Sequence, residues 1–140
     1  MKVNTYLNFG GNCAEAFQFY ADHLGAKILG MMKYSQAPGM EVPAERANFV
    51  LHGMMTIGDA TLMASDVDPE RFKPIRSVYL ALRVGSDAEA ERIFTVLGEG
   101  GEVYMPMQET FFASRYVQFR DRFGVSWMVL HEKPMGPPPA

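Results

Sequence analysis

The sequence predicts an α+β fold made of two βαβββ modules, because the chain repeats itself and both copies show the same succession of patterns. Residues 6–25, YLNFGGNCAEAFQFYADHLG, return in outline at residues 79–98, YLALRVGSDAEAERIFTVLG. Each copy combines a short alternating strand, a turn, an amphipathic helix and a glycine, and strand-rich sequence follows both. Two units are too few for a solenoid. We therefore expect a duplicated half-domain whose halves share a core, with function placed where the halves meet.

The first module opens with an alternating strand over residues 3–9, which places Leu7 and Phe9 on one face and Tyr6 and Asn8 on the other. After a Gly-Gly turn, Asn12 and Glu15 form the pattern of a capping box, which predicts the start of a helix. An apolar stripe then runs along that helix to a stop at Gly25. The stripe residues are Cys13, Phe17, Tyr20 and Leu24, and the strands predicted after the helix cover 26–34, 47–57 and 60–65.

The second module repeats this order after a polar connector with two prolines at residues 67–76. Its first strand is predicted at 77–84, and Ser86 with Glu89 repeats the capping box. The remaining expected elements are a helix stripe of Ala90, Ile93, Phe94 and Leu97 and strands at 101–107, 113–120 and 125–132. We expect one domain over 1–133, with modules at 1–66 and 77–133, and a flexible proline-rich tail at 134–140.

Composition narrows the function classes. A chain of 140 residues suits a single domain with a real core. The net charge of -3, with scattered Lys and Arg, argues against a nucleic-acid partner, and no stretch approaches the roughly 20 apolar residues of a membrane span. The first strand begins too early for a signal peptide. A single cysteine excludes an internal disulfide and a multi-cysteine zinc site. We expect a soluble cytoplasmic protein that handles a small molecule.

The strand faces that carry mixed side chains are the candidate binding surface. Because a helix covers the wholly apolar face of each sheet, the mixed face is left for another purpose. It has apolar walls with a few polar anchors, as small-molecule pockets do, but a sheet with one face in water produces the same alternation. The residues on it are Asn4, Tyr6, Asn8, Thr61, Met63, Ser65, Tyr79, Arg83 and Met128.

The order of elements and three segments of the chain resemble the PhnB-like branch of the vicinal oxygen chelate superfamily. The segments are YLNFGGNCAEAFQFYADHLGAKI, IGDATLMASD and DRFGVSWMV. That superfamily holds glyoxalase I, extradiol dioxygenases and bleomycin-resistance proteins, and the resemblance covers residues 3–132. It implies a glyoxalase-like fold in which the mixed faces form a cupped sheet with the helices on the convex face, and a homodimer. Some PhnB-like profiles carry a ubiquinone methyltransferase label, which we do not adopt, because no glycine-rich strand-turn-helix is present to hold a methyl donor.

The same resemblance locates the metal ligands that enzymes of the superfamily use, usually His, a second His or a Gln, and Glu. The corresponding residues here are Asn4, Met63, Tyr79 and Met128. A thioether is a poor ligand for a hard cation, and an amide or a phenol is a weak one. We therefore expect no metal, no other cofactor and no catalytic residues, and a metal-free cup that binds a small organic molecule.

The predicted ligand-binding set draws on the mixed faces and on matches to family motifs. His52 lies in VLHGMMTIGD, which matches a histidine-bearing PhnB-like motif, although a lone hydrogen-bonded histidine is the simpler interpretation. Phe112 stands where relatives often have Trp, and Arg83 and Arg115 are candidate anchors for an anionic or carbonyl group. The full set is Tyr6, Asn8, His52, Met63, Tyr79, Arg83, Phe112, Arg115 and Met128.

Two alternatives stay open at this point. The chain could be a metal-dependent lyase or dioxygenase of the same superfamily whose ligands are aligned differently. It could also be a structural dimer whose cup is filled by its own side chains. Cys13 opens a helix, where a thiol can become reactive, but it also begins the apolar stripe, which favours a packed and inert thiol.

Overall fold

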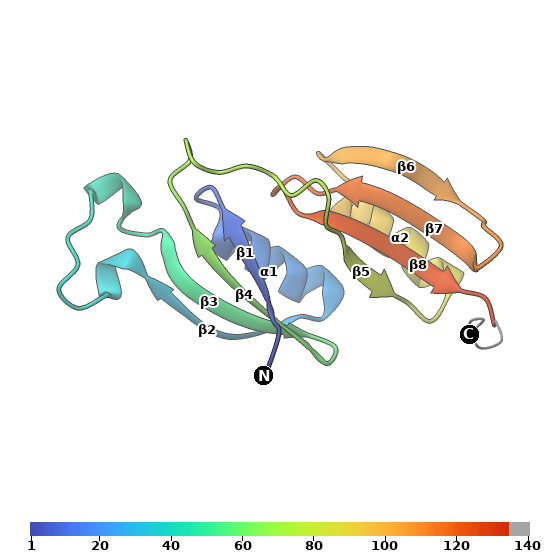
Figure 1. Cartoon of the computed structure of the whole chain (residues 1–140), viewed down its shortest axis with the longest axis horizontal. Coiled ribbons are helices and arrows are strands. Elements are labelled where there is room, and N and C mark those ends of the chain that lie inside the picture. Colours follow the sequence, from blue (N-terminus) through green and yellow to red (C-terminus); the bar gives the residue numbers. More distant parts are fainter. Residues whose placement is uncertain (135–140) are drawn as a thin grey trace. The chain divides into compact units, whose positions relative to one another are not determined.

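Each copy of the repeat folds as a four-stranded mixed sheet with one helix on a face, in a computed structural model that describes residues 1–134 (Figure 1). The chain divides between Lys73 and Pro74 into two units, called module one and module two below. The α+β fold with two βαβββ modules that the repeat predicted is confirmed.

Module one has the strand order β1-β4-β3-β2, in which β1 is parallel to β4 and the other neighbours are antiparallel. The helix α1 packs against β2, β3 and β4. Two short 3-10 helices, η1 (Tyr34–Gln36) and η2 (Ala44–Arg46), lie in the long loop before β3. The main elements are β1 (Thr5–Phe9), α1 (Cys13–Leu24), β2 (Lys27–Lys33), β3 (Val50–Ile57) and β4 (Ala60–Asp66).

Module two repeats this topology with the strand order β5-β8-β7-β6 and a parallel β5–β8 pair. The helix α2 packs against β7 and β8. The predicted strand at 77–84 shortens to four residues, because only Leu80 to Arg83 pair with β8. The elements are β5 (Leu80–Arg83), α2 (Asp87–Leu97), β6 (Glu102–Gln108), β7 (Ala113–Arg120) and β8 (Ser126–Glu132).

The apolar strand faces lie under the helices, as the alternation predicted. In module one the buried residues include Leu7, Phe9, Phe17, Tyr20 and Ala64. In module two they include Ile93, Val117, Phe119, Trp127 and Val129. Fully burying one large apolar side chain stabilises the fold by roughly 1.5–3 kcal/mol. These contacts therefore fix which face of each sheet stays uncovered by its helix.

The predicted capping box at Asn12 is wrong, and a distant carboxylate replaces it. The side chain of Asn12 caps no backbone N–H, and its Oδ1 atom is buried without a hydrogen-bond partner among the described residues. Asp66, at the end of β4, accepts instead from the N–H groups of Gly11 (2.9 Å) and Cys13 (3.0 Å). Its other oxygen accepts from the N–H of Val50 at 2.9 Å, so one buried side chain joins three segments of module one.

The start of α2 follows the local rule. The Oγ atom of Ser86 accepts a hydrogen bond from the N–H of Glu89 at 3.1 Å, which confirms the predicted N-cap. A buried carboxylate also organises module two, where Asp121 accepts from the N–H groups of Phe123 (2.9 Å) and Val125 (3.0 Å). Its second oxygen accepts from the indole N–H of Trp127 at 2.8 Å.

The Gly10–Gly11 turn that links β1 to α1 is closed by aromatic rings. A Cβ atom on Gly10 would lie 3.1 Å from the ring of Phe72, and one on Gly11 would lie 2.8 Å from the ring of Phe49. Gly11 also has a φ of 113°, which side chains rarely adopt. Gly10 and Gly11 form the predicted turn, and the nearby rings and the backbone conformation of Gly11 explain why it needs glycine. Among residues 1–134, no helix is long and apolar enough to cross a membrane.

Candidate functional site

The face of the module-one sheet opposite α1, called here the outer face, carries several of the predicted site residues. Strand pairing places Tyr6 beside Met63 and Met63 beside Met54, and Asn8 lies beside Ser65. Their neighbours in sequence, such as Leu7 and Ala64, are buried on the helix side. The outer face therefore combines the polar side chains of Tyr6, Asn8 and Ser65 with the side chains of Met54 and Met63.

A hydrogen-bonded chain of side chains crosses this face. The hydroxyl of Tyr6 lies 3.2 Å from Nδ1 of His52 and 2.5 Å from Oγ of Ser65. Oγ of Ser65 in turn donates to the carbonyl oxygen of Leu51 at 2.7 Å. The Tyr6 and His52 rings also lie near each other, with centroids 5.9 Å apart. Residues from β1, β3 and β4 are thus linked across the face.

The direction of these hydrogen bonds fixes the tautomer of His52. A carbonyl only accepts, so the single Ser65 hydroxyl hydrogen goes to Leu51. Ser65 must then accept from the Tyr6 hydroxyl, whose oxygen is left to accept from His52. Nδ1 of His52 therefore carries the hydrogen in the neutral ring, and Nε2 presents a lone pair. Among the described residues no group donates to Nε2.

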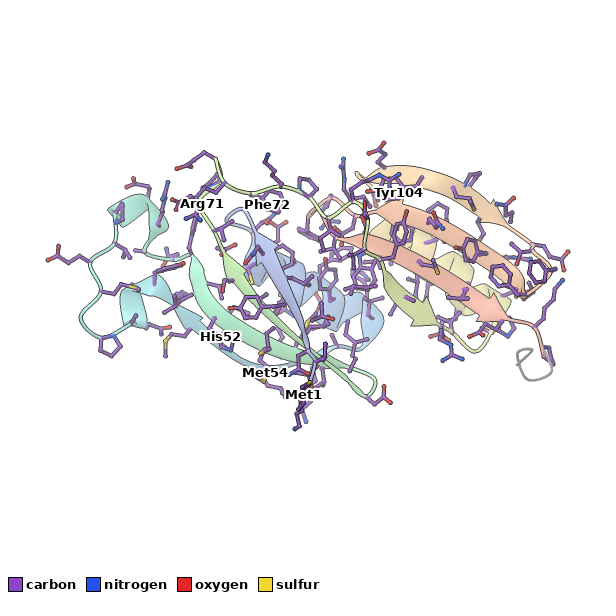
Figure 2. The ribbon with its side chains drawn as sticks, viewed as in Figure 1. Met1, His52, Met54, Arg71, Phe72 and Tyr104 are labelled. Carbon is purple, nitrogen blue, oxygen red and sulfur yellow. The ribbon has the colours of Figure 1, made fainter. Side chains whose placement is uncertain are left out.

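An open hollow of about 270 Å³ lies beside His52. Figure 2 shows His52 and Met54 projecting from β3, which forms one side of it. Methionine side chains are flexible and make favourable contacts with aromatic rings. The hollow thus places an apolar, adaptable wall next to one hydrogen-bond acceptor. Its lining residues are Leu29, Gly30, Met31, Met32, His52 and Met54.

Most of these lining residues were not predicted from the sequence. Met54 shares the parity of His52, which the family motif had selected, so alternation along the strand could have added Met54 to the set. The β2 residues carried a weaker signal, because the predicted strand 26–34 has apolar side chains on both faces. Leu29 and Met32 are in fact exposed, at 52% and 44%.

Asn8 lies at a second hollow in module one, also of about 270 Å³. Its other lining residues come from the segment that follows β4, and Figure 2 shows Arg71 and Phe72 on that segment. They are Val67, Arg71, Phe72 and Lys73. The prediction treated this segment only as a connector, although two cations in such a short stretch were a visible signal.

Side chains of module two itself pack on its uncovered face around two of the predicted residues. Tyr116 and Leu130 are buried on it, each 8% exposed. Phe112 and Met128, both in the predicted set, pack against this cluster together with Met105. Phe112 also meets the Tyr116 ring edge-on, with centroids 5.3 Å apart.

Tyr79 and Arg83 have partners within module two. Arg76 donates to the Tyr79 hydroxyl at 3.0 Å and stacks over the ring of Tyr104, 3.9 Å from its centroid (Figure 2 labels Tyr104). Arg83 is exposed and forms an ion pair with Glu132. The hydrogen bond that Arg83 donates to this carboxylate raises the pKa of the guanidinium. Both side chains lie on the uncovered side of the sheet, but each already binds a protein group.

Arg115 does not lie on the uncovered face. It shares its parity in β7 with Val117 and Phe119, which are buried on the helix side of the sheet, so its side chain reaches α2. Nε of Arg115 lies 2.9 Å from Glu91, and its guanidinium lies 3.6 Å from Asp87. The hydrogen bond to Glu91 and the charge of Asp87 raise the pKa of Arg115. We therefore remove Arg115 from the candidate site.

The residues at the superfamily's metal-ligand positions do not fit a divalent metal. In module one these are Asn4, which precedes β1, and Met63, which pairs with Tyr6. In module two they are Tyr79, which binds Arg76, and Met128, which packs in the apolar cluster. Neutral amide, phenol and thioether groups are weak ligands for such ions. Among residues 1–134, no three His, Cys, Asp or Glu side chains are grouped as a metal site would require.

Cys13 is buried against the core at the start of α1. Burial, and in smaller part the negative charge of Asp66, raise the pKa of the thiol to about 12. The thiolate is the reactive form of cysteine, so the structure supports a packed and inert role for this residue.

Cys13 should make stability depend on pH in the alkaline range. Because the folded pKa exceeds the unfolded one, the thiol contributes stability that is complete below about pH 9 and is lost as pH rises toward about 12. Urea unfolding at pH 8 and pH 10.5 should show wild type losing up to about 2 kcal/mol more than Cys13→Ala over this interval. Equal losses in both proteins, or rapid alkylation of folded wild type at pH 8, would contradict this.

Comparisons with known proteins agree with the observed fold. A family model described as 3-demethylubiquinone-9 3-methyltransferase matches residues 1–130. Protein YjdN of Escherichia coli is 30% identical over 141 residues, covering 92% of this chain and 94% of YjdN. Protein PA1353 of Pseudomonas aeruginosa is 41% identical with a TM-score of 0.84, over 96% of this chain and 99% of that one.

Two further structures place the fold. A PhnB protein of Bacillus cereus, described as a putative 3-demethylubiquinone-9 3-methyltransferase, is 25% identical with a TM-score of 0.79, over 94% and 99% of the two chains. The fosfomycin resistance protein FosX of Listeria monocytogenes, solved with Mn(II), has a TM-score of 0.63 at 13% identity, over 93% and 90%. The FosX likeness concerns the fold alone, which is that of the vicinal oxygen chelate superfamily.

Proposed function

This chain belongs to the PhnB-like family described as 3-demethylubiquinone-9 3-methyltransferase, within the vicinal oxygen chelate superfamily, and from that premise we propose that the outer face of module one binds a small hydroxyaromatic molecule. The observation that carries the proposal is the acceptor Nε2 of His52 at the edge of a methionine-lined hollow. Small-molecule sites combine apolar walls with a few placed polar groups, and this surface has both.

The hydrogen-bond chain selects the kind of polar group. A neutral His52 held by Tyr6 through Nδ1 offers an acceptor, so the ligand must bring a donor such as a phenolic or enolic hydroxyl. The ring of such a ligand would lie on Met32 and Met54. The family description names demethylubiquinone, a ring with a hydroxyl group, which is a molecule of this chemistry.

We assign binding rather than methyl transfer. In each described sheet one pair of strands is parallel, β1 with β4 or β5 with β8, and the other pairs are antiparallel. Folds that hold dinucleotide-like cofactors use a mostly parallel sheet and an open glycine-rich turn, whereas the rings of Phe49 and Phe72 fill the Gly10–Gly11 turn. The homodimer stays a prediction. The alternative of a surface filled by its own side chains describes module two, where an apolar cluster packs, better than module one, where a hollow lies beside His52.

The proposal predicts a difference between two matched ligands. p-Cresol has the required hydroxyl, and 4-methylanisole replaces its hydrogen by a methyl group. Calorimetric titration of wild type should show saturable p-cresol binding and about three- to tenfold weaker 4-methylanisole binding, which corresponds to one hydrogen bond of about 0.5–1.5 kcal/mol. In His52→Ala the two ligands should bind equally weakly.

The internal repeat supplies a control for the Tyr6 variant. Tyr6→Phe removes the group that orients His52, so p-cresol should bind about three- to tenfold more weakly. Tyr79→Phe makes the same change at the equivalent residue of module two and should leave binding unchanged. The proposal fails if p-cresol and 4-methylanisole bind wild type equally, or if the two Phe variants weaken binding to the same extent.

A further inference from the structure

The hollow at Asn8 has the composition of an anion site. It is lined by Arg71 and Lys73 with the amide of Asn8, and its apolar part consists of Val67 and Phe72. Neither cation forms an ion pair or a side-chain hydrogen bond with any residue from 1 to 134. Asn8 likewise has no side-chain hydrogen bond within the described chain. Three donor side chains thus converge on one hollow without protein acceptors.

The acids nearest to these cations in sequence are bound to other groups. Asp68 and Glu70 both form ion pairs with Arg46, and the hydrogen bond that Arg46 donates to Asp68 raises the pKa of the guanidinium. Asp66 is buried and accepts three backbone N–H groups. None of these three acids pairs with Arg71 or Lys73, so the two cations keep their donors for a bound anion.

The segment that carries the cations is held in place before any ligand arrives. The N–H of Val67 donates to the carbonyl of Phe9 at 2.7 Å, which continues the β1–β4 pairing. The N–H groups of Arg71 (2.8 Å) and Phe72 (3.1 Å) both donate to the carbonyl of Asp68, which closes a turn. The Phe72 ring packs on Gly10. A site built on an ordered backbone loses less entropy on binding.

We propose that this hollow binds a phosphate group, either as inorganic phosphate or on a small organic molecule. Arg71 supplies planar N–H donors that match the geometry of a phosphate, Lys73 supplies a second charge, and Asn8 supplies an amide donor. Phe72 and Val67 offer an apolar surface to an organic substituent. The proposal does not depend on hydroxyaromatic binding at His52, because no lining residue is shared between the two hollows.

The test is a titration of the full chain with sodium phosphate at constant ionic strength, followed by amide NMR. Wild type should give saturable shifts in residues 67–73 with a millimolar Kd. Arg71→Ala and Lys73→Ala should each weaken binding at least threefold, and the double variant at least tenfold. The matched control is Lys2→Ala with Lys27→Ala, which removes the same two charges from exposed residues elsewhere in module one.

The outcomes separate a site from general electrostatics. Shifts that rise linearly without saturation, or equal weakening by the two double variants, would overturn the proposal. Asn8→Ala gives a third arm that leaves the charge unchanged and should weaken phosphate at least twofold. Phenyl phosphate then distinguishes the sources: tighter binding than inorganic phosphate assigns the hollow to an organic phosphate, and equal binding assigns it to the phosphate group alone, as the proposal also allows.

Discussion

Replacing Asp66 with alanine is expected to lower the free energy of unfolding by about 4 kcal/mol. The side chain is 2% exposed and accepts hydrogen bonds from the backbone of Gly11, Cys13 and Val50. Its removal leaves three N–H groups without acceptors inside module one, and each buried unsatisfied group costs about 1–3 kcal/mol before the structure relaxes. Urea unfolding followed by circular dichroism measures this loss.

Two further variants show whether the hydrogen bonds are responsible. Asp66→Asn keeps one acceptor oxygen but turns an amide donor toward a backbone N–H, so it should cost about 2 kcal/mol or more. Asp22→Asn changes an exposed carboxylate that accepts a hydrogen bond from Gln18 on α1, and should cost less than about 0.5 kcal/mol. Similar values for Asp66→Ala and Asp22→Asn would show that Asp66 does not hold the three segments together.

Replacing Trp127 with alanine is the second change of large expected effect. Trp127 is 1% exposed, and its indole N–H is bound by the buried carboxylate of Asp121. Removing the ring leaves a cavity in module two and takes one donor from Asp121, so the expected loss is about 3–5 kcal/mol. Unfolding must be followed by circular dichroism, because Trp127 is the single tryptophan of the chain.

An exposed aromatic residue of the same module is the control for Trp127. Phe111 is 82% exposed, so Phe111→Ala should cost less than about 0.5 kcal/mol. Trp127→Phe keeps most of the apolar volume and removes the N–H donor, and it should give an intermediate loss. If Trp127→Ala proved as mild as Phe111→Ala, the assignment of the apolar strand faces to the helix side would be wrong.

The repeat and the alternation of side chains were enough to predict the fold. The order of elements followed from the similarity of residues 6–25 and 79–98, and the strand predicted at 113–120 is β7 to the residue. The parity rule placed Leu7 and Phe9 on one face, which is buried, and Tyr6 on the opposite face. These features are local, with a period of two in strands, so one sequence reveals them.

Long-range hydrogen bonds were the features that local patterns could not reveal. Asp66 lies 53 residues from Cys13, whose N–H donates to its carboxylate. The capping-box pattern at Asn12 does not indicate that a carboxylate from β4 will accept these hydrogen bonds instead. The register shift in β7 is similarly invisible, because it depends on the pairing with β8. Arg115 is a different case, because it shares the parity of the buried Val117 and Phe119, so alternation along β7 could have placed it on the side of α2, where it binds Glu91.

The binding face was predicted in part. Parity and the family motif selected Tyr6 and His52, which the structure brings into hydrogen-bond contact. The assignment of Phe112 and Met128 to the site used the same reasoning, but packing fills that face of module two with Tyr116 and other side chains. Alternation shows which face of a strand a residue occupies; whether neighbours fill that face depends on side-chain volumes in three dimensions.

The central claim, that the outer face of module one binds a hydroxyl donor through His52, is tested most directly by the nitrogen NMR signals of that imidazole in its neutral form. We predict a hydrogen on Nδ1 and none on Nε2, and a change on adding p-cresol that is largest at Nε2, accompanied by shifts of the Met32 and Met54 methyl groups. A hydrogen on Nε2 in the free protein, or p-cresol shifts confined to module two, would contradict the account.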